Sequence, residues 1–264
     1  MRSVLLVVAI GIAVFTTPVE AQPFTAQVDF GKTTQANWPP PPAGWNRVDE
    51  NGVVWWPNSI QADGRLREPN GTLTDIALTV PNSFDYTWDN GRNEELTAAN
   101  GVVFPSFSNF GTQGVVITVA DVGATNGAVR LTSPTLYEYT LTFAATWLNS
   151  GSADTLLNVG GTWDQINSDF IGGNTIALKT SEYPVETNLT GILTALPTWN
   201  GTNWVLDIGV GNSAGSGNAP LSAMHISAAV PQVQSVPEPT SVALWSLIGL
   251  GLAGFGYCRL RRKK

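Results

Sequence analysis

The feature that most constrains the fold of residues 22–234 is a series of short stretches in which apolar and polar side chains alternate. Residues 137–143 read YEYTLTF, so tyrosine, leucine and phenylalanine alternate with glutamate and threonine. A period of two places the apolar set on one face of a strand and predicts half-buried sheet. Similar stretches occupy residues 73–80, 84–88, 115–119 and 204–210. Only residues 94–99 favour a short helix.

Asn-Gly pairs separate many of these stretches. Such pairs include residues 70–71, 90–91, 100–101, 126–127 and 200–201. Asparagine and glycine tolerate the positive φ angles that short antiparallel connections need. We therefore expect residues 22–234 to form one all-β domain, an antiparallel two-sheet β-sandwich.

The charge of this region excludes one class of partner. Residues 22–236 carry seven basic and eighteen acidic side chains, a net charge of −11. Such a surface repels phosphate backbones, so we expect no nucleic-acid binding.

Both ends of the chain have the composition of export signals. An apolar run at residues 4–15 precedes small residues at 19–21, which predicts a signal peptide over residues 1–21 and cleavage by signal peptidase before Gln22. Residues 242–258 are uncharged and are followed by the basic tail 259–264. This pattern predicts a transmembrane helix of about 25 Å whose basic tail stays cytoplasmic.

A short linker, residues 235–241, precedes that helix and contains Pro237, Glu238 and Pro239. Together with the helix and the Arg-rich end, it resembles the PEP-CTERM sorting signal of Gram-negative bacteria. The resemblance implies that these three residues are recognised by exosortase, a membrane-embedded enzyme for which the chain is a substrate. It also implies a membrane-anchored precursor that then reaches the cell surface or an extracellular polysaccharide matrix.

A second resemblance concerns the domain between the ends. The opening 28–31 (VDFG), residues 139–143 (YTLTF), 159–161 (VGG) and the closing 221–226 (LSAMHI) look like the galactose-binding-like jelly rolls of secreted bacterial proteins. The resemblance implies a jelly roll in which the first and last strands pair. It supplies no fixed active-site motif.

Metal ligands are few. One histidine and no cysteine outside the predicted helix exclude an ordinary zinc site. Asp85, Asp89 and Glu94 are close in sequence and offer the oxygen ligands that calcium prefers. The resembled jelly rolls often hold a structural calcium, and an acidic solvated turn is the alternative interpretation. No other cofactor is expected.

Two strings resemble catalytic motifs. Residues 211–215 (GNSAG) match a nucleophile elbow and precede His225, but no carboxylate lies between the serine and the histidine. Residues 249–254 (GLGLAG) match a dinucleotide fingerprint, but they lie inside the predicted helix. We expect neither to be catalytic.

The tryptophans are the strongest binding signal. Glycine, asparagine or proline lies beside Trp45, Trp163 and Trp199, which predicts that these three lie in loops. Trp56 follows another tryptophan, and neighbouring side chains in an extended segment point to opposite faces, so at least one of these two rings is expected to be exposed. Exposed indole rings hold the apolar faces of sugars, although a loop tryptophan also covers a core. We therefore expect a non-catalytic module, structural or weakly carbohydrate-binding. A secreted glycan-acting hydrolase, with carboxylates that only the fold brings together, is the alternative.

Overall fold

The structure is a computed structural model, and it divides the chain into two compact units, Met1–Val230 and Pro231–Lys264. The residues it describes are 23–31, 43–49, 51–57, 59–81, 85–86, 95–104, 115–118, 128–145, 154–164, 166–179, 189–213 and 218–231. Within these ranges every regular element is a strand. The all-β prediction is confirmed for this part of the chain.

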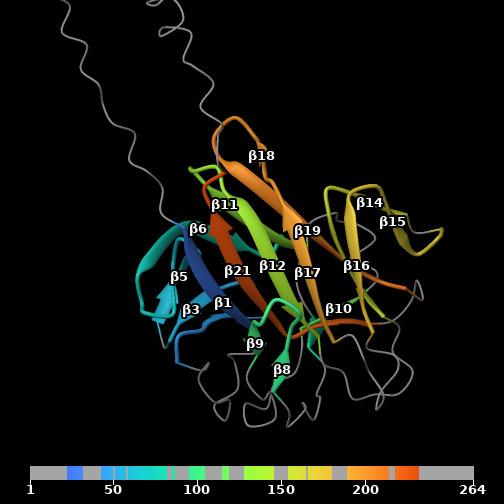
Figure 1. Ribbon diagram of the computed structural model, residues 1–264, viewed down its shortest axis with the longest axis horizontal. Coiled ribbons are helices and arrows are strands. Elements are labelled where there is room, and N and C mark those ends of the chain that lie inside the picture. The colour runs from blue at the N-terminus through green and yellow to red at the C-terminus, as the bar shows by residue number, and fades with distance from the viewer. Residues whose placement is uncertain are drawn as a thin grey trace, which may run out of the picture. The chain divides into compact units, whose positions relative to one another are not determined.

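The first large sheet has the strand order β17-β12-β21-β1-β2-β3-β4. Its strands are β1 (Phe24–Phe30), β2 (Asn46–Val48), β3 (Val54–Trp56), β4 (Ser59–Gln61), β12 (Glu138–Ala144), β17 (Thr190–Ala195) and β21 (Ala223–Ala229). β1 pairs antiparallel with β21, from Phe24 opposite Ala228 to Asp29 opposite Ala223. The first and last strands of the domain therefore lie side by side near the centre of this sheet (Figure 1).

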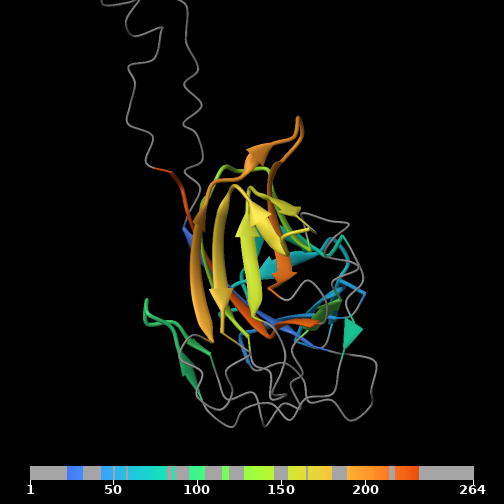
Figure 2. The same cartoon turned by 90° about the vertical axis from the view of Figure 1, so that its right-hand side faces the viewer.

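The second large sheet has the order β16-β13-β19-β11-β6-β5, and β18 pairs with β19 outside this path. Its strands are β5 (Arg65–Arg67), β6 (Leu73–Thr79), β11 (Val129–Ser133), β13 (Thr155–Val159), β16 (Asn174–Leu178), β18 (Thr198–Trp199) and β19 (Trp204–Asn212). All of its pairs are antiparallel. The hairpin of β18 and β19 extends beyond the ends of the neighbouring strands (Figure 2).

Three smaller groups of strands complete the described fold. A three-stranded sheet has the order β20-β10-β7, with β7 (Asp85–Tyr86), β10 (Val115–Thr118) and β20 (Asn218–Leu221). Two hairpins pair β8 (Leu96–Thr97) with β9 (Val103–Phe104), and β14 (Thr162–Asp164) with β15 (Asp169–Ile171).

One hydrophobic core joins the two large sheets. Leu141 and Ile226 of the first sheet and Leu131 and Ile208 of the second are fully buried members of the same cluster. At one border β16 lies against β17, and at the other β3 lies against β5. The two sheets therefore form a sandwich whose borders approach each other. The finer assignment to a jelly roll stays a prediction.

The strands predicted from alternation are confirmed, because β6, β7, β10, β12 and β19 fall within or close to the predicted ranges. The helix predicted at residues 94–99 is wrong, since Leu96 and Thr97 form β8. The turn at Asn100-Gly101, where Gly101 has φ +81°, folds β8 onto β9. This hairpin packs its own small apolar cluster around Phe104, and Asn100 donates a hydrogen bond to the buried Thr142. Tertiary packing has overridden local helix propensity.

Among the described strands, one pair departs from the antiparallel expectation. β1 and β2 run parallel, and a buried ion pair joins them. Nε and Nη2 of Arg47 donate to Oδ2 of Asp29 at 2.9 and 2.8 Å, while Oδ1 of Asp29 is buried without a partner among the described residues. Burial raises the pKa of the Asp29 carboxyl, and the Arg47 guanidinium opposes that rise. The pair fixes the register of β2 at the cost of desolvating two charges.

We predict that Asp29→Leu lowers the free energy of unfolding by about 3–5 kcal/mol, because it leaves the Arg47 charge buried without a carboxylate. The double variant Asp29→Leu/Arg47→Met recovers most of that loss, because no charge then remains buried. Chemical unfolding followed by tryptophan fluorescence measures both values. The matched control is Asp207→Leu, which breaks the exposed Arg130–Asp207 pair and costs about 1 kcal/mol or less. Equal losses at Asp29 and Asp207 would contradict the prediction.

Candidate functional site

The β18–β19 hairpin carries two tryptophans directly opposite each other. Trp199 and Trp204 are partners in the register, and their ring centroids lie 5.3 Å apart with planes inclined by 56°. Trp199 is 51% exposed, and Trp204 is half-buried. Cross-strand contact between two rings restricts the rotamers of both. The hairpin therefore presents one exposed indole that is supported from the side.

A hydrogen-bonded turn closes this hairpin. The side-chain oxygen of Asn200 accepts the backbone N–H groups of Thr202 and Asn203, each at 2.9 Å, and the Asn200 N–H donates to the carbonyl of Asn203 at 3.0 Å. Gly201 has φ +100°, a conformation that side chains with a Cβ rarely adopt. The two asparagines next to the tryptophans therefore sit on a defined backbone.

The expectation of exposed rings at Trp45 and Trp163 is wrong. Trp45 is 6% exposed and contacts Phe104, with ring centroids 6.3 Å apart. Trp163 lies in β14, is 8% exposed and contacts Phe170 edge-on at 5.0 Å. A Cβ at Gly211 would overlap the Trp163 ring, so this tryptophan is packed directly against the backbone of β19. Both rings therefore contribute to packing.

The remaining predicted tryptophan lies elsewhere in the fold. Trp56 is half-buried in β3, a strand of the first sheet, and its neighbour Trp55 is also half-buried and donates its indole N–H to Asp49 at 2.9 Å. The structure therefore does not gather Trp45, Trp56, Trp163 and Trp199 into one site. Of the four, Trp199 has the exposure that sugar stacking requires.

The predicted calcium ligands fall largely outside the described residues. Asp85 lies in β7, where the backbone alone is described, and Asp89 and Glu94 lie outside. Across the ranges that the structure describes, no three His, Cys, Asp or Glu residues are grouped to hold a metal ion. Calcium binding at 85–94 stays a prediction.

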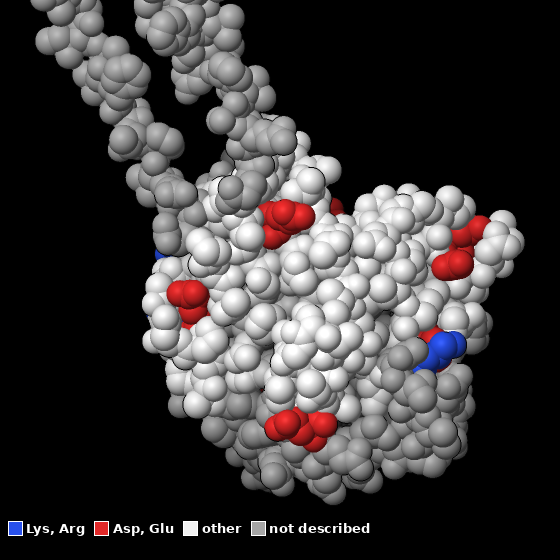
Figure 3. All heavy atoms as spheres, viewed as in Figure 1, with Lys and Arg blue, Asp and Glu red and all other residues white. Residues whose placement is uncertain are grey.

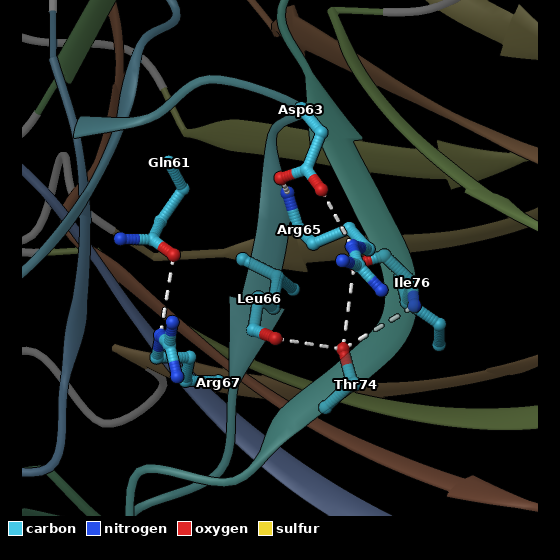
Figure 4. Close-up of polar contacts among 7 residues, drawn as sticks. All are labelled: Gln61, Asp63, Arg65, Leu66, Arg67, Thr74 and Ile76. Atoms are coloured by element: carbon cyan, nitrogen blue, oxygen red, sulfur yellow. Dashed lines mark hydrogen bonds and ion pairs between the residues drawn. The ribbon is translucent and has the colours of Figure 1, made fainter.

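The described surface also contains a pocket of about 200 Å³ beside the β5–β6 hairpin. Its lining includes two carboxylates, Glu68 and Asp75, and two aromatic rings, Phe24 and Tyr137. Figure 4 shows this hairpin and the side-chain hydrogen bond that joins its two strands. In that hairpin the Thr74 hydroxyl donates to the Leu66 carbonyl at 2.8 Å.

Electrostatics in this pocket involve Tyr137. Its hydroxyl donates to Oδ1 of Asp75 at 3.0 Å. Burial first, and then Asp75, raises the pKa of Tyr137 to about 12, so the hydroxyl stays neutral and donates at physiological pH. The sequence did not indicate this pocket. The Asn70-Gly71 pair predicted a turn between Glu68 and Asp75, but nothing local linked these residues to Tyr137, which lies 62 residues from Asp75.

The serine and histidine of the elbow-like string have separate surroundings. The Ser213 hydroxyl accepts the backbone N–H of Asp154 at 3.1 Å. His225 lies in β21, opposite Gln27 and Thr142 in the register. Its Nδ1 is buried without a hydrogen-bond partner among the described residues, and burial lowers the pKa of this imidazole.

Pro237, Glu238, Pro239 and the predicted helix at 242–258 lie outside the described residues. Among the residues that are described, none belongs to a helix that could cross a bilayer. A family model for the PEP-CTERM protein-sorting motif matches residues 235–263, which confirms the predicted motif. The motif implies an exported protein, made as a membrane-anchored precursor and processed by exosortase. A comparison with curated proteins found no match.

We predict that acid destabilises the domain through His225. Because its pKa is lower in the folded state than the unfolded value of about 6.5, the unfolded chain binds more protons between those two values. The free energy of unfolding therefore falls as the pH drops below about 6.5, and this contribution levels off below the folded pKa. His225 is the one histidine of the chain, so NMR of its ring gives the folded pKa directly. His225→Gln removes this part of the pH dependence, and a measured pKa at or above 6.5 would contradict the prediction.

Proposed function

We propose that this chain is an exported surface protein whose β-sandwich is a non-catalytic module, structural or weakly carbohydrate-binding. Its place of action is the cell surface or the extracellular polysaccharide of a Gram-negative-type bacterium. The observation that carries the sugar-binding part is the 51% exposure of Trp199 on a hydrogen-bonded hairpin, with Trp204 beside it. The sorting motif supplies the setting.

A supported indole suits the apolar face of a pyranose. Covering an apolar surface gains about 25 cal/mol per Å², so stacking on a half-exposed tryptophan contributes about 1–2 kcal/mol. Hydrogen bonds from Asn200 and Asn203, which flank the turn, add about 0.5–1.5 kcal/mol each. Affinity for one sugar unit is therefore weak, in the upper micromolar to millimolar range, and multivalent display at a surface strengthens it.

The charge of the surface favours neutral glycans. Basic side chains are rare on the face shown in Figure 3, and acidic ones are separated by uncharged surface. The net charge of −11 over residues 22–236 repels uronate-rich polymers unless a divalent cation bridges the two. Neutral polysaccharides meet no such barrier.

The alternative function, hydrolysis of glycans, requires two carboxylates about 5–10 Å apart in a cleft that also holds the sugar. The pocket beside β5 and β6 contains Glu68 and Asp75, but no tryptophan belongs to its described lining. Trp199 lies on a different hairpin. These observations favour binding over hydrolysis.

We predict that both ends of the chain are removed during export. In a host with exosortase, the mature protein begins near Gln22 and has lost the segment from about Thr240 onward, because the signal peptide and the sorting motif flank the domain. Intact-mass measurement of the native protein gives both ends. A mature protein that still carries Lys264 would refute the second cleavage.

We predict that Trp199→Ala weakens binding to a neutral polysaccharide about tenfold, because it removes the stacking surface. The assay passes the purified full chain, in a polyoxyethylene detergent without a sugar headgroup, over immobilised neutral glucans and galactans and over alginate. Each column is run with and without chelator. We expect retention on a neutral polymer and little on alginate.

Leu196→Ala is the matched control, because Leu196 is 60% exposed beside the same hairpin but has no ring. We expect Leu196→Ala to bind like the wild type and Trp199→Phe to keep part of the affinity. If the wild type binds no polymer, or Trp199→Ala binds equally well, the domain is structural. Release of reducing sugars from a polymer would favour the hydrolase alternative.

A further inference from the structure

The last described strand, β21, ends beside the connection from β17 to β18. Tyr139 of β12 is the register partner of Ala195 on one side and of Ala228 on the other. Two strand spacings, about 10 Å, therefore separate the end of β17 from the end of β21. Figures 1 and 2 both show the β18–β19 hairpin at this end of the domain. The chain thus leaves β21 close to the segment 196–199.

This segment exposes apolar side chains without any charge. Leu196 is 60% exposed and Trp199 is 51% exposed. Residues 187–206 contain no Asp, Glu, Lys or Arg, although residues 22–236 carry a net charge of −11. An anionic phospholipid surface therefore repels the domain as a whole but does not repel this hairpin.

One exposed acid is found at the same end of the first sheet. Glu138 begins β12 and is opposite Ala229 in the register. The β18–β19 hairpin extends beyond the ends of the neighbouring strands (Figure 2). Its uncharged turn can therefore reach a flat surface without bringing Glu138 into contact with that surface.

The chain that follows β21 leads to a membrane. The sorting motif at residues 235–263 implies a membrane-anchored precursor. Residues 230–241 separate β21 from the predicted transmembrane helix, and a chain of that length spans at most about 40 Å. So short a tether keeps this end of the domain within reach of the bilayer. Tryptophan favours the membrane–water interface, where its ring is in an apolar medium and its N–H still meets polar groups.

We infer that the β18–β19 hairpin lies against the lipid headgroups of the membrane that anchors the precursor, before exosortase cuts the chain. Leu196 and Trp199 enter the interface, and the neutral turn at Asn200 faces the headgroups. Cleavage removes the tether and frees the hairpin, and its indole then meets polysaccharide. The lipid contact depends on the sorting motif and not on sugar binding, so either one fails without the other.

The test uses the full-length precursor, made in a host without exosortase and reconstituted in vesicles of phosphatidylethanolamine and phosphatidylglycerol. Cys258→Ser removes the one native thiol, and Thr202→Cys attaches an environment-sensitive dye to the exposed turn. Lipids that carry a nitroxide near the top of the acyl chain quench a dye at the interface. Ala99→Cys is the reference site, because the β8–β9 turn packs near Ala144, at the far end of β12. We expect roughly twofold or stronger quenching at residue 202 than at residue 99.

Substitutions show which side chains make the contact. Trp199→Ala and Leu196→Ala each lower the quenching at residue 202 by about half, because each removes part of the apolar surface. Ile60→Ala is the matched control, since Ile60 is 54% exposed but its register places it level with Asp29, near the far end of β1. It leaves the quenching unchanged. Leu196→Ala also separates the two roles, because it weakens lipid contact and leaves polysaccharide binding intact.

Three results would overturn the inference. The first is equal quenching at residues 202 and 99, and the second is wild-type quenching in both hairpin variants. The third is a dye at residue 202 that reports an apolar environment without quenching by lipid, which would show that a second copy or another segment of the chain covers the hairpin. Because the hairpin is uncharged, we expect the quenching to persist at about 0.5 M salt, and its loss would also contradict an apolar contact. Thermal unfolding verifies that each variant is folded.

Discussion

The pairing of β1 with β21 is the constraint on which the first sheet depends. Six consecutive residues of β1 face β21, which places strands from the two ends of the domain between β12 and β2. The inward-facing side chains of both, such as Val28 and Ile226, are fully buried in the core shared with the second sheet. With no cysteine in this region, burial and strand pairing supply the cohesion that disulfides supply in many exported domains.

Alternation of apolar and polar residues predicted the strands because a residue's position along a strand decides which face of the sheet its side chain lies on. The sequence of β12 therefore located Tyr139, Leu141 and Phe143 in the core. It could not show that Thr142, on the opposite face, is buried beneath the β8–β9 hairpin, since that depends on a distant segment. The burial of Trp45 and Trp163 likewise depends on segments distant in the sequence. A neighbouring glycine indicates a turn, but only the fold decides which residues cover the tryptophan ring.

The Trp199 hairpin and the pocket beside β5 and β6 differ in physical character. The hairpin exposes an apolar indole, whereas the pocket is lined in part by the carboxylates of Glu68 and Asp75. Sequence reasoning found the first because tryptophan is a strong signal by itself. It missed the second because acids are common and because Tyr137, which completes the pocket, comes from a strand connection far away in the chain.

The position of β21 also sets the timing of folding. Phe24 is synthesised about two hundred residues before its partner Ala228, and contacts so distant in sequence form late and slowly. Until residues 223–229 emerge, the place between β1 and β12 in the first sheet stays empty. The sorting motif begins at residue 235, and residues 230–234 lie between it and the end of that strand. The last described strand and the processing signal are therefore synthesised in close succession, and a chain that ends early lacks both.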